Sequence, residues 1–410
     1  MNEMTEFDRL PPGFRLLCLA ARPRRAVPDE AIAACAAAIG DWSQVVAGAT
    51  SHHVVPLVAD LALRPGAAAM PAAVRNDLIG RRDRQVRRCL RQTAELIRLT
   101  QAMEASGIRC LALKGVALSQ RIHGDPSRRG LGDIDLLVDP LRFDAARTLL
   151  AGLGYALDDP RVAASGIERS ATAVRDLAFR HAHGHLLELH QRLTQDESLL
   201  PFSFETLWQG RRTVPGWTWP VFTLSAEHEG LYLLVHGAEH GWTRLRWIAD
   251  LAPLFQDEPL YRAAQAQAAA LDLGPGITDA RILCRHLLEA PSPAGEAEKS
   301  RAVIKRHHRW FVAETAWVRP PAPDQVNWYQ MRELRLRWGR YTLRRTWKGA
   351  ASCLLADLSE PVDWHLFNLP PVLRWLYPLL RPLGWLIRRY RARRQPEPVR
   401  AGRGGKVPRD

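Results

Sequence analysis

The sequence predicts an α+β protein in which an α/β core lies between two helical regions. Apolar residues recur at three- and four-residue spacing before residue 100 and again after residue 224, which is typical of amphipathic helices. Between these regions, short apolar runs next to Gly-rich loops indicate buried strands. We therefore expect four parts: a helical N-terminal region at 1–100, the core at 101–222, a helical C-terminal domain at 223–320, and a basic, Trp-rich extension at 321–410.

The core is predicted element by element. The N-terminal helices give way to an apolar run at Ile108–Leu113, which predicts a buried strand. After it we expect a helix at 115–122, a strand at Ile134–Val138 entered through the Gly-rich loop 124–132, a helix at 143–153 that ends at Gly154, and a strand at Leu186–Leu189. Helical spacing then covers 224 to about 273 and 280–315, with a loop at 291–297.

The composition is that of a folded protein. The chain has 410 residues, 47% of them hydrophobic and 24% charged, which excludes a disordered or collagen-like chain. The formal net charge of +14 is compatible with three anionic partners: nucleic acid, a membrane surface or a polyphosphate ligand. Much of the excess lies at the end, where nine Arg and one Lys stand against two acidic residues between 381 and 410. The body is only mildly basic.

Cysteine spacing and apolar runs bear on the compartment. The six cysteines are far apart and form no C-x-x-C pair, which argues against a zinc ribbon or a disulfide scaffold and favours a reducing compartment. No apolar run has the length of a signal peptide or of a spanning helix. We therefore expect a cytoplasmic protein.

The strand predicted at Ile134–Val138 is next to the candidate metal-binding residues. The segment Gly132 to Asp139 reads GDIDLLVD, and the two-residue period of a strand places Asp133 and Asp135 on one face. Two adjacent carboxylates repel each other unless a divalent cation lies between them, and oxygen ligands of this kind suit Mg²⁺ that is also held by substrate phosphates. For an isolated D-x-D pair, two solvated aspartates at a strand end are the simpler interpretation.

Two further segments strengthen the metal–nucleotide interpretation. Upstream, Lys114 and Gly115 stand between a strand and a helix, so the turn can bring backbone N–H groups, a helix N-terminus and a cation to a phosphate. Downstream, Glu188 alternates with Leu187 and Leu189, as a third carboxylate directed at a metal would.

These pieces together resemble the nucleotidyltransferase superfamily of DNA polymerase beta, and more narrowly an uncharacterised family of bacterial nucleotidyltransferase-fold proteins. Order and spacing match from about residue 14 to residue 260. The matching segments are LKGVAL (113–118), RGLGDIDLLV (129–138), LLAGLGY (149–155), LELHQRL (187–193) and HGAEHGWTRLRWIADLA (236–252). The resemblance implies a core with a mixed sheet.

The resemblance also implies roles for individual residues. Asp133 and Asp135 are expected to bind two Mg²⁺ (or Mn²⁺) ions, with Glu188 as the third carboxylate. Lys114 and Gly115 take the place of the superfamily's Gly-Ser phosphate turn, and Arg129 is an expected phosphate contact. The reaction implied is transfer of a nucleotidyl group from a metal-bound NTP to an unidentified small molecule, peptide or protein.

The carboxylates then predict a mechanism. Paired metal ions stabilise the attacking oxygen and the leaving pyrophosphate in an in-line displacement at the α-phosphorus. Glu188 either holds the metal nearer the acceptor or acts as base for its hydroxyl. Asp135→Asn is expected to abolish transfer and leave the fold intact, because the strand loses charge and no volume.

Two departures from the superfamily pattern suggest a second hypothesis. The turn around Lys114 and Gly115 offers no hydroxyl, and the gap from Gly115 to Asp133 is longer than usual. The intervening segment also carries Arg121, His123 and Arg128, cations close to the expected triphosphate. A catalytically silent relative that binds a nucleotide or a partner protein is therefore the alternative function.

A zinc metallopeptidase is the less favoured alternative. His236, Glu239 and His240 fit the H-x-x-E-H motif, and helical i, i+4 spacing puts both imidazoles on one face. The third ligand would come from Glu296, Glu298 or Glu314. In the nucleotidyltransferase interpretation, the same segment is a helix packed near the cleft. His181, His183, His185 and His190 resemble a second cluster, but in one regular strand His190 would face away from the other three.

The C-terminal extension mixes apolar, aromatic and cationic residues from Leu366 to Arg394. This mixture suits a helix at an anionic membrane interface or a helix docked on a partner protein, and packing on the chain's own body is the equal alternative. Pro370, Pro371, Pro378 and Pro382 exclude one straight spanning helix. Nucleic acid is a minor possibility, because no known nucleic-acid module accompanies the basic end. Peripheral association with the inner membrane face is thus an alternative to a purely cytoplasmic location.

Overall fold

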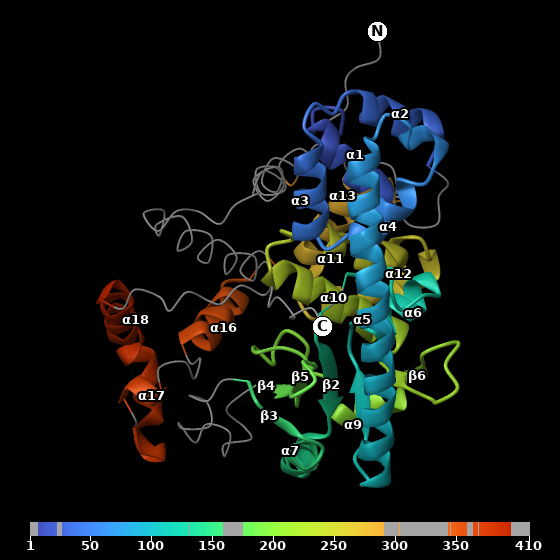
Figure 1. The fold of residues 1–410 in the computed structure, drawn as a ribbon. Coiled ribbons are helices and arrows are strands. Elements are labelled where there is room, and N and C mark those ends of the chain that lie inside the picture. The colour runs from blue at the N-terminus through green and yellow to red at the C-terminus, as the bar shows by residue number, and fades with distance from the viewer. Residues whose placement is uncertain are drawn as a thin grey trace.

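The computed structural model describes most of the chain up to residue 290 and parts of the C-terminal extension. The described residues are 7–22, 27–130, 132–158, 175–290, 303, 343–344, 346–358, 364–367 and 369–394. The loop expected at 291–297, the later part of the helix expected at 280–315, and residues 321–342 lie outside them. Figure 1 shows helices at both ends of the chain around one sheet.

The N-terminal region is helical, as predicted. Its elements are α1 (Pro12–Ala21), α2 (Asp29–Ala37), α3 (Trp42–Ser51), α4 (Val55–Leu61), a 3₁₀ turn η1 (Pro65–Ala67) and α5 (Ala72–Ala105). α5 has 34 residues, so it is about 51 Å long at 1.5 Å per residue. In Figure 1 it runs from the N-terminal helices down along the sheet. It therefore connects the N-terminal helices to the core.

The core contains a mixed seven-stranded sheet, which confirms the predicted fold class. Its strands are β1 (Cys110–Ala112), β2 (Ile134–Val138), β3 (Tyr155–Leu157), β4 (Asp176–His181), β5 (Leu186–His190), β6 (Arg212–Thr213) and β7 (Phe222–Thr223), in the spatial order β3-β4-β5-β2-β1-β7-β6. The pairs β2–β5 and β1–β7 are parallel and the others are antiparallel. β2 has the predicted bounds, and β5 extends one residue beyond them, to His190.

Helices connect these strands. They are α6 (Val116–His123), the 3₁₀ turn η2 (Pro140–Arg142), α7 (Phe143–Gly152) and α9 (Phe204–Gln209). The expected helix at 115–122 thus starts one residue later and ends one residue later, at His123, and the next residue, Gly124, has a left-handed φ of 67°. Arg121 and His123 consequently belong to the helix and not to the loop.

The two faces of the sheet pack against different helices. On β2, Ile134, Leu136 and Val138 share a buried cluster with residues of α5 and α7, such as Leu99 and Leu150. The opposite face contributes Leu111, Leu113 and Leu137 to a second cluster with Leu231, Leu234 and Val235. Because side chains alternate along a strand, Asp133 and Asp135 lie on this second face, toward the helices that follow the sheet.

The C-terminal region up to residue 290 is also helical, as predicted. Its elements are α10 (Ala226–Glu239), α11 (Leu245–Leu251), the 3₁₀ turn η4 (Ala252–Phe255), α12 (Glu258–Ala270) and α13 (Gly274–Leu288). These helices share one buried cluster with α1 to α4. The division into an N-terminal region, a core and a C-terminal domain stays a prediction, and the two helical regions have a common hydrophobic core.

The described part of the C-terminal extension is mainly helical. It contains α16 (Trp347–Leu358), α17 (Trp364–Phe367), the 3₁₀ turn η7 (Pro371–Leu376) and α18 (Tyr377–Arg394). Within the described ranges, no single helix has both the length and the apolar character needed to cross a bilayer. Only α2 and α3 taken together have that length and apolar character, and these two helices are bent by 118° relative to each other.

Candidate active site

The pairing of β2 with β5 brings two of the three predicted carboxylates together. The strands are parallel and the register places Asp135 beside Glu188. Both side chains lie on the sheet face that packs toward α10, and their carboxylate oxygens lie within 4.8 Å of each other. Asp133 precedes β2 by one residue on the same face. The structure thus gathers Asp133, Asp135 and Glu188 at one end of these central strands.

Burial differs among the three carboxylates. Asp135 is 2% exposed, whereas Asp133 is half-buried and the Glu188 side chain is 27% exposed. A molecule in solvent therefore reaches the cluster from the side of Asp133 and Glu188. Asp135 lies at the inner end of the cluster.

Lys114 points into this cluster. Its ammonium forms an ion pair with Asp135 Oδ1, and Nζ lies 3.9 Å from Glu188 Oε2. The position of Lys114 follows from the pairing of two strands. β1 and β2 are antiparallel and pair Ala112 with Leu136, and the Leu113 N–H donates to the Asp135 carbonyl at 3.1 Å. Lys114, the next residue, therefore lies beside the start of β2. Its predicted role, a contact to phosphate, stays a prediction.

His190 joins the cluster, and sequence reasoning did not assign it there. It is fully buried, and its Nε2 lies 3.3 Å from Asp135 Oδ1 and 3.4 Å from Glu188 Oε2. A sequence signal existed, because His190 follows Glu188 by two residues on the same strand and so shares its face. Asp135, Glu188 and His190 form a group of three possible metal ligands in the described part of the chain.

Crowding and burial shift the protonation equilibria of the cluster in opposite directions. Burial, with the negative charges of Asp135 and Glu188, raises the pKa of Asp133 to about 6. Burial alone would raise the pKa of Asp135 too, but the charges of Lys114 and His190 lower it below its usual value. Burial opposes the charged form of Lys114, yet the surrounding carboxylates raise its pKa overall. Asp135 and Lys114 are therefore an ionised pair at neutral pH.

The donor set fits a divalent cation. Asp135 Oδ1 contacts Lys114 and His190, whereas Oδ2 is buried and has no hydrogen-bond partner among the described residues. A buried carboxylate oxygen without a partner costs free energy, about 1–3 kcal/mol or more for a charged group, and a metal ion would satisfy it. Carboxylate oxygens are the ligands that Mg²⁺ prefers, and a site with imidazole also suits Mn²⁺ and later transition metals.

The predicted phosphate turn lies next to the carboxylates. Gly115 has φ 73°, a left-handed conformation that favours glycine, and it is the residue before α6. A Cβ at this position would lie 3.2 Å from the Asp133 carbonyl oxygen, so the turn and the start of β2 are in close contact. The first N–H groups of α6 consequently begin beside Asp133. Such groups have no partner within their own helix and suit an anion.

Arg129, the other predicted phosphate contact, lies in a buried ion pair. Its Nε is 2.8 Å and 2.9 Å from the two oxygens of Asp250 in α11, and its Nη2 is buried without a partner among the described residues. Burial alone would lower the pKa of Arg129, but Asp250 raises it overall. The guanidinium is therefore charged and held in place. Whether Nη2 meets a phosphate stays a prediction.

Side chains of α5 hold the loop before β2. Gln85 Nε2 donates to the carbonyl oxygens of Ser127 and Arg129 at 3.0 and 3.1 Å, and Gln92 Nε2 donates to the Gly132 carbonyl at 2.9 Å. The Arg129 N–H also donates to Ser119 Oγ in α6 at 3.0 Å. The loop that carries Arg129 and leads to Asp133 is thus fixed to two helices.

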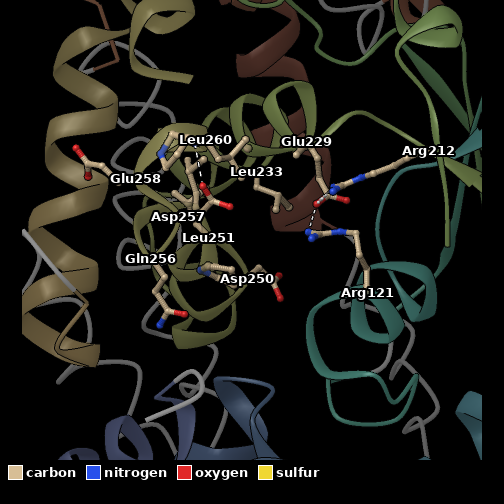
Figure 2. Close-up of a pocket in the computed structure, with 15 residues that line it drawn as sticks. Arg121, Arg212, Glu229, Leu233, Asp250, Leu251, Gln256, Asp257, Glu258 and Leu260 are labelled. Carbon is tan, nitrogen blue, oxygen red and sulfur yellow. Dashed lines mark hydrogen bonds and ion pairs between the residues drawn. The ribbon is translucent and has the colours of Figure 1, made fainter. Parts of the chain in front are cut away.

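Two other cations of this segment are paired elsewhere. Arg128 lies 3.0 Å from Asp60. Arg121 forms an ion pair with Glu229 of α10, which also accepts from Arg212 at 2.9 Å. Figure 2 shows Arg121 and Arg212 converging on Glu229 in the wall of a pocket of about 470 Å³ that Asp250 also lines. The Arg129–Asp250 pair therefore links this pocket to the loop before Asp133.

The histidines of the alternative zinc motif are in a different setting. The His240 ring stacks on Trp247 with centroids 4.8 Å apart, and the His236 ring lies 4.6 Å from that of His240. Together with Glu239 they do not form a close group of three ligand atoms in the described ranges. The proposed third ligands, Glu296, Glu298 and Glu314, lie outside the described residues.

The second histidine cluster is divided, for a reason other than strand parity. The chain turns between β4 and β5, so one regular strand through all four histidines is wrong. His181 lies with its ring 4.7 Å from that of His183 and 6.3 Å from that of His185, at the hairpin turn. His190 is at the other end of β5, against Asp135.

Comparison with known protein families matches the chain to one of them. A family model described as an uncharacterised nucleotidyltransferase matches residues 40–289, more than half of the chain. The match includes all three carboxylates, the phosphate turn and the loop with Arg129. Neither the curated proteins nor the solved structures contain a match to the chain.

Proposed function

Because the chain belongs to the uncharacterised nucleotidyltransferase family, we propose that it transfers an NMP group from a metal-bound NTP to an acceptor. The observation that carries the proposal is the carboxylate cluster, in which Asp135 and Glu188 lie side by side and Asp135 Oδ2 is buried without a partner. Asp133, Asp135 and Glu188 are the residues that would hold Mg²⁺ or Mn²⁺. A bound divalent cation supplies charge neutralisation for the triphosphate and for the leaving pyrophosphate.

The chain's own residues account for the rest of the reaction. The N–H groups at the start of α6, beside Gly115, bind a phosphate, and the positive charge of Arg129 favours the triphosphate. An acceptor hydroxyl oxygen forms a bond to the α-phosphorus, and the bond from that phosphorus to the bridging oxygen breaks. Pyrophosphate leaves with the electron pair. The partly exposed carboxylate of Glu188 takes the proton of the hydroxyl.

A labelled-NTP screen tests this proposal. The full chain is incubated with each of the four labelled NTPs and with Mg²⁺ or Mn²⁺, and candidate acceptors are analysed for the mass of an added nucleotide. We expect one NTP to be consumed with release of pyrophosphate, and Glu188→Gln to reduce the rate by at least about 100-fold, as loss of a general base does. The matched control is Asp144→Asn in α7, an exposed carboxylate away from the cluster. Equal rates in Glu188→Gln and wild type would end the proposal.

A catalytically silent member is the second candidate, and the Lys114–Asp135 ion pair favours it. A cation of the chain already neutralises part of the carboxylate cluster, so nucleotide binding without turnover is consistent with the geometry. Equilibrium binding of labelled NTPs distinguishes the two functions. Binding without pyrophosphate release in any NTP and metal combination would identify the silent member.

Location and contacts of the C-terminal extension belong to the same proposal. All six cysteines are buried thiols that form no disulfide, which supports a reducing compartment such as the cytoplasm. On α18, Leu379, Leu383, Leu386 and Tyr390 are all exposed and follow one another at three- and four-residue spacing, so they form one apolar stripe. An apolar stripe on a helix rich in Arg suits the surface of an anionic membrane. We infer peripheral membrane contact through this stripe.

A further inference from the structure

Lys114 places a positive charge inside the carboxylate cluster. Its side chain is 11% exposed, its ammonium is paired with Asp135, and Nζ is 3.9 Å from Glu188 Oε2. A lysine loses much hydration free energy when it is buried in this way, so its placement depends on the carboxylates around it. One position between Asp135 and Glu188 is thus already occupied by a cation of the chain.

The two oxygens of Asp135 have different surroundings. Oδ1 accepts from Lys114 and lies 3.3 Å from His190 Nε2. Oδ2 is buried and has no hydrogen-bond partner among the described residues. Asp135 therefore has one oxygen left for a metal ion, although a carboxylate that bridges two ions needs one oxygen for each.

Charge balance leads to the same count. The three carboxylates carry three negative charges when ionised, and Lys114 neutralises one of them. One divalent cation neutralises the remaining two. In the absence of a bound triphosphate, a second divalent cation would leave an excess of two positive charges in a partly buried site, which is unfavourable in a medium of low dielectric constant.

We propose that the Lys114 ammonium takes the place of one of the two divalent cations, so that the site binds one divalent cation and not two. This inference rests on the proposed nucleotidyl transfer. The ammonium lies between Asp135 and Glu188, on the side assigned above to the acceptor, and there it stabilises the negative charge that develops on the attacking oxygen. Asp135, through the Oδ2 that has no hydrogen-bond partner among the described residues, and Asp133 would hold the single divalent cation.

Counting bound Mn²⁺ tests the inference without measuring activity. The metal-free full chain is equilibrated by dialysis with Mn²⁺ alone, and the Mn²⁺ retained per chain is measured by elemental analysis. We expect one ion in the wild type and two in Lys114→Met, in which the ammonium is absent. Lys114→Arg retains the positive charge and is expected to bind one ion. Circular dichroism establishes whether each variant is folded.

The outcomes separate this inference from the proposed function. Two ions in the wild type, or one ion in a folded Lys114→Met protein, would overturn the inference, and the proposed transfer would stand if NTP is still consumed. If Lys114→Met does not fold, Lys114→Gln replaces it and the wild-type count still decides. No bound ion in the wild type together with no consumption of any NTP would overturn both.

Discussion

The buried pair of Lys114 and Asp135 predicts a strong energetic coupling between these residues. Removing one partner of a buried ion pair costs about 3–5 kcal/mol, because the other charge is left buried without compensation. Glu188 remains 3.9 Å from Nζ, so Asp135→Asn is expected at the lower end, about 3 kcal/mol. The sequence alone predicts that this substitution leaves the fold intact. The ion pair changes that expectation, since the lysine would lose its direct partner.

Lys114→Met should also destabilise the metal-free protein. It removes the positive charge among Asp133, Asp135 and Glu188, so that their repulsion is no longer screened. In the double variant Lys114→Met/Asp135→Asn neither buried charge remains. We therefore expect its loss of stability to be smaller than the sum of the two single losses, by about 2 kcal/mol, which is within the range for directly interacting residues.

Urea denaturation followed by circular dichroism measures these free energies. Each protein is unfolded in EDTA at pH 7.5, and the free energy of unfolding is extrapolated to zero urea. Asp144→Asn, the exposed aspartate of α7, serves as the control and is expected to match the wild type. Additive losses in the double variant would refute the coupling and, with it, the view that Lys114 and Asp135 form a unit.

Three further predictions follow from other parts of the structure. His52 is buried, accepts a hydrogen bond from the Leu245 N–H at 3.1 Å and has its pKa lowered by burial to about 3, so its neutral form is favoured by folding. The free energy of unfolding therefore decreases as the pH falls below about 6.5, by about 2 kcal/mol at pH 5. Urea unfolding of His52→Asn at the same pH values should show a smaller decrease than the wild type. Parallel curves of unfolding free energy against pH for the two proteins would contradict this. Glu229→Gln removes the ion-pair partner of Arg121 and Arg212 and should lower the free energy of unfolding in urea by about 3 kcal/mol. Glu258→Gln, at an exposed residue of the same pocket, should leave this free energy nearly unchanged. Leu379→Glu should reduce flotation with anionic liposomes, whereas Leu141→Glu, at a more exposed leucine on η2, should not. Equal flotation of both variants would exclude the stripe as the contact.

The sequence was sufficient where the signal is local. The apolar run at Ile134–Val138 predicts β2 with its observed bounds, and strand alternation places Asp133 and Asp135 on one face. The same alternation applies to Glu188 on β5. The fold class follows from these patterns together with the helical spacing on either side.

Contacts between distant segments were not predictable from local patterns. Arg129 and Asp250 are 121 residues apart, and no local sequence pattern in either segment predicts that they form an ion pair. The expected phosphate role of Lys114 stays a prediction, and the ion pair that the register of β1 and β2 gives it with Asp135 was not foreseen. Strand alternation placed His190 on the face of Glu188, but its contact with Asp135 depends on the pairing of β5 with β2, which no local pattern predicts.

The helical phase of α5 has a consequence for the loop that leads to Asp133. Gln85 and Gln92 are seven residues apart, nearly two full turns, so both amides leave the same side of the helix and reach the loop. One alanine inserted between them would rotate the second amide by about 100° and detach it from Gly132, while an insertion of seven residues would restore its direction and displace it by about 10 Å. The arrangement therefore requires both the angular offset and the axial spacing of these two glutamines, and a chain that changes either one loses an attachment of the loop.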